Sequence, residues 1–434
     1  MSMQRKKAEK IADFSSNKPS GDSEDAAADR PEPGSALQVM PLEQCQIKGE
    51  LSGTRGTNRN LSGRSSLKAG NDLEALRAWL NARAANPNTF SAYRKEAERF
   101  LLWCVIERRT ALSSLTMEGA SLYLRWLEDL GRLSDKAWAE RWNVPQSIWI
   151  GAKNVERTDP SWKPFNGPLS FASRRQAMTV IRLLFNFLVK TGYLNYSPFD
   201  QVPPKIPFLP GEGAPEQFAD RSLSHDQWED ILDQLRGLPE GEEKARFEAI
   251  LMMGKGLGMR ASEMLASRAG WIRKRKLGNR SLLMIEVVGK GDKVRRLPLQ
   301  QDHLRILNQY LRTRGLQPIG ACPPDTPLLT RLGRGRKAEH KGTSLSRSGL
   351  HKILKTFFED AAVEAEKKDP MDGAKLREAS THWLRHTFAA VALDAMPVNV
   401  VQTALGHASL STTSLYLVPT EQKMAEGMKK IKPL

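Results

Sequence analysis

Two stretches near the end of the chain decide its interpretation: THWLRHTFA (residues 381–389) and LGHASLSTTSLY (residues 405–416). In the first, His382 lies three residues before Arg385. On a helix this spacing sets both side chains on one face, about one turn apart. The second stretch contributes His407 and ends at Tyr416. Two imidazoles, a guanidinium and a phenol are therefore expected within one folded unit.

Two further patterns upstream add charged groups to this set. GLGMRASE (residues 256–263) runs into a predicted helix and offers Arg260, with Glu263 one turn later. VVGKGDKVRRLPL (residues 287–299) contains two β-rich runs on either side of GKGD (residues 289–292), which is typical of a hairpin. The hairpin tip offers Lys290, with Lys293 as the alternative lysine.

These groups suit chemistry at a phosphodiester. A guanidinium pairs with two phosphate oxygens, so Arg260 and Arg385 can hold both non-bridging oxygens and stabilise the charge that builds there. His382 titrates near neutral pH and can act as an acid or a base at the phosphate that the arginine holds. His407 can hydrogen-bond a phosphate oxygen, and Glu263 can orient the surrounding side chains.

Tyr416 is the expected nucleophile. A tyrosine reacts poorly at its ordinary pKa of about 10, but its phenolate leaves readily from phosphorus, so the covalent step is reversible. The departing 5'-alkoxide needs a proton, and Lys290 at the hairpin tip can deliver it. This scheme requires no metal and no other cofactor. Each residue taken alone has an ordinary structural explanation, and it is their ordered combination that indicates chemistry.

The order Arg, Lys, His-x-x-Arg, His, Tyr, in the contexts GxR, GKGxKxRxxPL, HxLRHTFA and LGH-x8-Y, resembles the tyrosine recombinase (phage integrase) family. The resemblance covers roughly residues 223–420. It implies a catalytic set of six residues: Arg260, Lys290, His382, Arg385, His407 and Tyr416.

The family resemblance also implies a fold and a reaction. The expected fold is mainly α, with an N-terminal helical core-binding (SAM-like) domain and an α+β catalytic domain that holds a small antiparallel sheet. The expected reaction is site-specific recombination of double-stranded DNA through a 3'-phosphotyrosyl bond, by a homo-tetramer that joins two sites, with accessory DNA-bending proteins as possible partners. Integration, excision or resolution of a mobile element is the expected purpose. A type IB topoisomerase and a DNA-binding regulator on an inactive scaffold are the alternatives.

The composition fits a nucleic-acid partner. The 434 residues contain 66 Lys and Arg against 49 Asp and Glu, a formal charge of +17 that favours a polyanion. Residues 1–71 hold 11 basic and 9 acidic residues, so the excess lies in the rest of the chain. Three distant cysteines predict neither a disulfide framework nor a zinc site. With no long apolar run, we expect no membrane partner and a cytoplasmic protein associated with a prokaryotic nucleoid.

The chain is predicted to comprise four parts. Residues 1–71 are polar and of low complexity, which predicts a disordered extension. Helical periodicity over 72–203 predicts an all-helical domain, which the family resemblance implies is the core-binding domain. Its Trp-rich insertion at 131–168 we interpret as a satellite core rather than a base-stacking loop. The Pro-rich segment 204–222 predicts a linker, and residues 223–434 form the catalytic domain and its tail. The basic run RKRK (273–276) and the insertion have no place in the family pattern.

Overall fold

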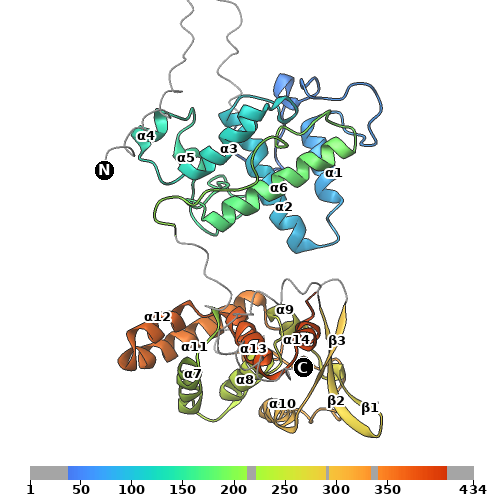
Figure 1. Ribbon diagram of the computed structural model, residues 1–434, viewed down its shortest axis with the longest axis vertical. Coiled ribbons are helices and arrows are strands. Elements are labelled where there is room, and N and C mark those ends of the chain that lie inside the picture. The colour runs from blue at the N-terminus through green and yellow to red at the C-terminus, as the bar shows by residue number, and fades with distance from the viewer. Residues whose placement is uncertain (1–37, 213–220, 290–292, 334–340, 408–434) are drawn as a thin grey trace, which may run out of the picture. The chain divides into compact units, whose positions relative to one another are not determined.

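The chain forms two compact units, Met1–Glu212 and Gly213–Leu434, each with its own hydrophobic core. The computed structural model describes residues 38–212, 221–289, 293–333 and 341–407. Most of the ordered backbone is helical and one small sheet is present (Figure 1), so the predicted mainly α fold is confirmed.

The N-terminal unit is a helical assembly around α6, which packs against α1, α2 and α3. Polar caps begin these helices: the side chains of Asn71, Thr116 and Ser170 accept backbone N–H groups in the first turns of α1, α3 and α6. The helices are α1 (Asp72–Asn81), α2 (Pro87–Leu102), α3 (Met117–Asp129), α4 (Asp135–Ala139), α5 (Gln146–Trp149) and α6 (Phe171–Lys190). A π-helical turn, η2 (Trp103–Glu107), continues α2, and short 3-10 turns span Gly49–Ser52 (η1) and Leu112–Ser114 (η3).

The Trp-rich insertion 131–168 packs into the main core of this unit. Trp138, Trp149 and Phe165 stand edge-on around the buried Trp126 of α3, with ring centroids 5.9, 5.0 and 5.5 Å from it. The indole N–H of Trp142 donates to Asp129, also on α3. These tryptophans are therefore core residues, but they extend the central core and do not form the satellite core that we expected.

The prediction of disorder for residues 1–71 is wrong for residues 38–71. Leu42 and Cys45 are buried in the core of the N-terminal unit, and the backbone N–H of Leu42 donates to Glu98 at 2.7 Å. Asn58, only 1% exposed, exchanges hydrogen bonds with the backbone of Tyr196. Polar side chains and backbone groups hold this segment in place, and a composition-based prediction counts such residues as signs of disorder. Residues 1–37 lie outside the described residues.

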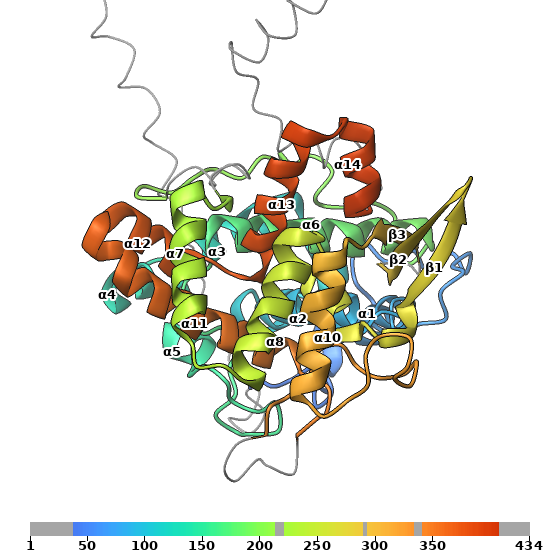
Figure 2. The same ribbon diagram turned by 90° about the horizontal axis from the view of Figure 1, so that it is seen from below.

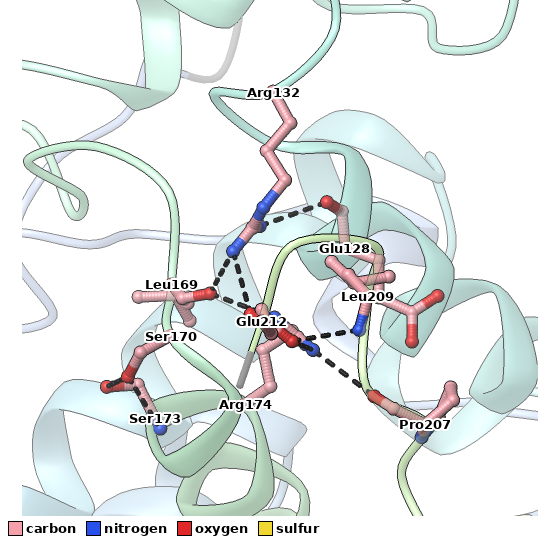
Figure 3. A network of polar contacts seen from close by, with 9 residues as sticks. All are labelled: Glu128, Arg132, Leu169, Ser170, Ser173, Arg174, Pro207, Leu209 and Glu212. Atoms are coloured by element: carbon pink, nitrogen blue, oxygen red, sulfur yellow. Dashed lines mark hydrogen bonds and ion pairs between the residues drawn. The ribbon is translucent and has the colours of Figure 1, made fainter. Parts of the chain in front are cut away.

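The predicted linker 204–222 also begins as part of the N-terminal unit. Arg174 of α6, whose side chain is fully buried, forms a fork with both carboxylate oxygens of Glu212 at 2.7 Å (Figure 3). The same guanidinium donates to the carbonyls of Leu169 and Pro207. The hydrogen bonds from Arg174 lower the pKa of Glu212 to about 2. Pro207 and Glu212 are therefore hydrogen-bonded to α6. Residues 213–220 lie outside the described residues.

Ser224 begins the first helix of the C-terminal unit, in a capping box with Gln227. Its helices are α7 (His225–Gly237), α8 (Glu242–Leu251), α9 (Ala261–Ala266), α10 (Gln301–Thr313), α11 (Arg347–Lys368), α12 (Pro370–Glu378), α13 (Thr381–Ala395) and α14 (Val398–Leu405). Its strands are β1 (Ile272–Leu277), β2 (Arg280–Val288) and β3 (Val294–Pro298). A π-helical turn, η5 (Met252–Gly256), follows α8, and a 3-10 turn, η6 (Ala269–Trp271), precedes β1.

The sheet is antiparallel with strand order β1-β2-β3, and it lies at one side of this unit while α11 and α12 lie at the other (Figures 1 and 2). The predicted hairpin is confirmed: Val288 pairs with Val294 across the turn. Strand β1 was not predicted, and it accounts for the basic run 273–276. These four side chains are exposed on an edge strand, where charge discourages pairing with another chain.

No helix in the described ranges is long and apolar enough to cross a membrane.

Candidate active site

Arg260 follows an irregular stretch of backbone. The π-helical turn η5 ends α8, and the N–H of Met259 then donates to the carbonyl of Met253 at 3.0 Å. Gly258 has φ +61°, and a Cβ there would lie 2.4 Å from a ring carbon of Phe388, so this position needs glycine. Arg260 follows as the N-cap of α9, in extended conformation. Such π-turns are frequent at functional sites.

Glu263 holds Arg260 from within α9. The Glu263 carboxylate is 2% exposed. It accepts hydrogen bonds from the backbone N–H of Arg260 at 2.7 Å and from the Arg260 guanidinium at 2.8 Å. It also accepts two hydrogen bonds from Arg295 of β3, at 2.7 and 2.8 Å. Burial alone raises the pKa of this carboxyl, but the hydrogen bonds and charge of Arg295, together with those of Arg260, bring the pKa below its ordinary value. Glu263 is thus an anion that positions two arginines, as the sequence predicts for Arg260.

Arg385 lies on α13 and is almost fully buried. Its guanidinium donates to the carbonyl of Gly258 at 2.5 Å and to that of Leu405 at 2.6 Å. It also contacts Nε2 of His407 at 3.1 Å. A guanidinium can only donate, so the Nε2 atom accepts in this contact. Helix α13 packs against η5 and α14, which explains why one arginine reaches both.

His407 lies directly after α14, which ends at Gly406 in left-handed conformation with φ +64°. The backbone N–H of His407 donates to the carbonyl of Gln402, and the Gln402 side chain donates to the carbonyl of His407. The Gly406 carbonyl faces Arg260, whose guanidinium lies 3.5 Å from it. The turn after α14 therefore meets both Arg260 and Arg385.

The histidines lie in a positive electrostatic environment. Burial, and then the charges of Arg385, Arg260 and Arg295, lower the pKa of His407 to about 4. The pKa of His382 is lowered by partial desolvation and by Arg385, Arg347 and Arg260. His386, 5.9 Å from His382 between ring centroids, has its pKa lowered to about 4 by burial and by the neighbouring charges. Both His382 and His407 are therefore neutral at pH 7 in the protein without ligand.

Of the predicted catalytic residues, the structure brings Arg260, Arg385 and His407 together through hydrogen bonds. His382 stands one turn before Arg385 on α13 and is exposed. Lys290 and Tyr416 lie outside the described residues. The alternative lysine, Lys293, directly precedes β3, and its carbonyl accepts the N–H of Gly289.

Sequence reasoning missed Arg295. The alternation in VRRLP (residues 294–298) carries a signal, because its second and fourth residues face inward and the second is an arginine. An inward charge on a strand requires a buried partner. Glu263 is that partner, but the sequence alone does not connect the two residues.

The arrangement offers an oxyanion site. Arg260 is held by Glu263 and Arg385 by two backbone carbonyls, so the donors of both arginines are oriented before any ligand arrives. Such preorganised positive charge stabilises a phosphorane-like transition state without reorganisation during the reaction.

Comparison with known proteins identifies the family of the C-terminal unit. Residues 221–423 match the model of the phage integrase family. Tyrosine recombinase XerC of Pediococcus pentosaceus is 24% identical over 77% of this chain and 96% of its own. Tyrosine recombinase XerD of Mycobacterium leprae is 26% identical over 78% of this chain and 96% of its own.

Two solved structures share the fold. The XerH site-specific recombinase bound to its difH substrate has a TM-score of 0.52 at 18% identity, and it covers 90% of this chain and 99% of its own. The Tn1549 transposon integrase in complex with transposon right-end DNA has a TM-score of 0.50 at 14% identity, and it covers 82% of this chain and 98% of its own.

The family match and the Xer relatives identify a tyrosine-type site-specific recombinase. Residues 221–423 form a domain of the phage integrase (tyrosine recombinase) family.

Proposed function

We propose that this recombinase cuts and rejoins double-stranded DNA through a 3'-phosphotyrosyl bond to Tyr416. The observation that carries the proposal is the convergence of Arg260, Arg385 and His407 around the turn 405–407. Two arginines and a histidine from three different elements meet there, and a scissile phosphate is a ligand that suits them. Tyr416 follows His407 by nine residues, which is the spacing of the family motif.

Each group has one task in the proposed step. Arg260 and Arg385 hold the non-bridging oxygens, and His407 donates a hydrogen bond to one of them once the phosphate has neutralised its surroundings. His382 takes the proton of the Tyr416 hydroxyl as the new O–P bond forms. Lys290 protonates the 5'-oxygen as the old O–P bond breaks, with Lys293 as the alternative donor. The reverse sequence rejoins the strand.

The biological setting follows from the same chemistry. Exchange between two duplexes requires four cuts, so the active form is a homo-tetramer on two paired sites, with accessory DNA-bending proteins where the sites must be brought together. The +17 formal charge favours this DNA partner. Integration, excision or resolution of a mobile element, in the cytoplasm at a prokaryotic nucleoid, is the role we assign.

The decisive experiment traps the covalent step. A duplex site is selected by binding from a random-sequence pool and nicked in its centre, so that the cut fragment diffuses away and the adduct accumulates. Mass spectrometry then locates the DNA-linked peptide. The adduct is expected on Tyr416 and is expected to be lost in Tyr416→Phe with DNA binding retained. The control is Tyr196→Phe, at an exposed tyrosine of the N-terminal unit. An adduct on any other residue would refute the assignment.

A second assay separates recombination from strand swivelling. A plasmid with two selected sites is tested for exchange products, and a plasmid with no site is tested for relaxation of supercoils. Exchange between sites is expected. Relaxation without exchange would identify a topoisomerase, and binding without either activity would identify a DNA-binding regulator.

A further inference from the structure

Arg295 is a buried cation that the proposed mechanism does not use. Strand β3 alternates, with Val294, Arg296 and Pro298 exposed and Arg295 and Leu297 buried. The Arg295 side chain is only 7% exposed. Burying a guanidinium on a short strand is costly unless every donor finds an acceptor. Its partners therefore indicate why an arginine stands there.

Those partners lie on two other elements. The two terminal nitrogens of Arg295 donate to both carboxylate oxygens of Glu263 at 2.7 and 2.8 Å, a planar fork that lysine cannot reproduce. The third nitrogen, Nε, donates to the carbonyl of Ala404 at 2.7 Å. One side chain thus ties β3 to α9 and to the last turn of α14.

Both contacts lead directly to proposed active-site residues. Glu263 also holds the backbone N–H and the guanidinium of Arg260. Ala404 lies three residues before His407, in the turn whose Gly406 carbonyl faces Arg260. A Cβ at Gly406 would lie 3.1 Å from Cδ of Arg295, so the turn packs closely on this side chain. Arg295 thus connects the carboxylate that holds Arg260 with the end of the helix that precedes His407.

We propose that Arg295 is a positioning residue, which fixes Arg260 and His407 relative to each other for the phosphate. The inference rests on the proposed function, because Arg260 and His407 are positioned for the phosphate that is cut in that function. Arg295 itself does not touch the phosphate in this scheme. Its loss lets the two donors separate, so transition-state stabilisation falls while ground-state DNA binding, which is spread over the protein, is kept.

The test compares Arg295→Ala and Arg295→Lys in the full chain with Arg296→Ala. Arg296 is the matched control, since it is the next residue on β3, faces outward and pairs with Glu286. Three quantities are measured on the nicked duplex: the rate of adduct formation at saturating DNA, the Kd for the same DNA, and the thermal midpoint. The rate is also measured with a bridging 5'-sulfur, whose leaving group requires no protonation.

We expect Arg295→Ala to slow adduct formation by about 100-fold, the size of effect that an ångström of misplacement produces. The Kd should stay within about threefold of the unsubstituted value. Sulfur should not restore the rate, because the defect lies at the non-bridging oxygens. Arg295→Lys keeps the charge but not the forked pair of hydrogen bonds, so its rate of adduct formation should lie between those of Arg295→Ala and the unsubstituted protein. If Arg295→Ala does not fold, the rate of Arg295→Lys decides the question.

Three outcomes overturn the proposal. The first is a rate for Arg295→Lys equal to that of Arg296→Ala. The second is a Kd that weakens by the same factor as the rate, and the third is full restoration by the sulfur substrate. Tyr416→Phe is assayed in parallel, and an adduct formed by that variant refutes the proposed function whatever Arg295 does. The failure of either idea is therefore recognised separately.

Discussion

Protonation of His407 is expected to couple DNA binding to pH. In the protein without DNA, burial and the charges of Arg385, Arg260 and Arg295 hold the pKa of this imidazole at about 4. A phosphate placed against the same arginines adds negative charge and raises the pKa back toward about 6.5. The complex then binds a proton that the free protein lacks between pH 4 and pH 6.5. DNA affinity must therefore rise as the pH falls through this window.

The magnitude follows from the two pKa values. Full recovery of the ordinary pKa strengthens binding at pH 5 relative to pH 7 by about 20-fold, or about 1.8 kcal/mol. The His407 ring is only partly buried, and solvent screens the interaction. Halving the free energy for this screening leaves about 1 kcal/mol, or about fivefold.

The assay is fluorescence anisotropy of a labelled selected duplex at pH 5 and pH 7, at constant ionic strength, with folding at both pH values checked by circular dichroism. His407→Gln should lose the fivefold enhancement. His351→Gln, at an exposed histidine of α11, should keep it and reports the contribution of general surface charge. An equal pH dependence in His407→Gln and in the unsubstituted protein would refute the reasoning.

Three further changes have defined outcomes. Lys290→Ala should slow cleavage of an ordinary duplex but not of one with a bridging 5'-sulfur, measured as adduct formation; if Lys293→Ala shows this rescue instead, Lys293 is the acid. Gly258→Ala should lower the free energy of unfolding by at least about 1–2 kcal/mol in urea titrations, since the left-handed backbone and a contact at 2.4 Å both oppose a Cβ. Gly278→Ala is the control: φ is +58° and no atom lies within 4 Å of a Cβ, so only the cost of the left-handed backbone should lower its free energy of unfolding. Trp149→Ala should cost about 3–5 kcal/mol by the same titration, and a value under about 1 kcal/mol would contradict its place in the core.

Local patterns were sufficient for much of the C-terminal unit. The capping box at Ser224, the antiparallel hairpin and the one-turn spacing of His382 and Arg385 are all encoded within a few residues. Such features depend on backbone periodicity and turn chemistry, which a sequence displays directly. The family motif added the relation between patterns that lie far apart in the chain.

Features that depend on distant partners were not predictable in the same way. Segment 38–71 is polar by composition, yet Asn58 binds a backbone 138 residues away and Leu42 reaches Glu98. The predicted linker likewise conceals Glu212, whose partner Arg174 lies inside α6. A carboxylate in a Pro-rich stretch looks solvated until the buried cation that it neutralises is known. Composition measures the average preference of a segment and not its individual contacts.

The same distinction explains how the candidate site is built. Arg385 is almost fully buried, and removing its charge from water costs desolvation free energy. The carbonyls of Gly258 and Leu405 offset that cost by accepting from its guanidinium on either side. They also fix the plane of the guanidinium, so the contacts that keep the cation buried are the ones that orient it. Folding of η5 and α14 around Arg385 therefore orients the charged groups of the candidate site before DNA arrives.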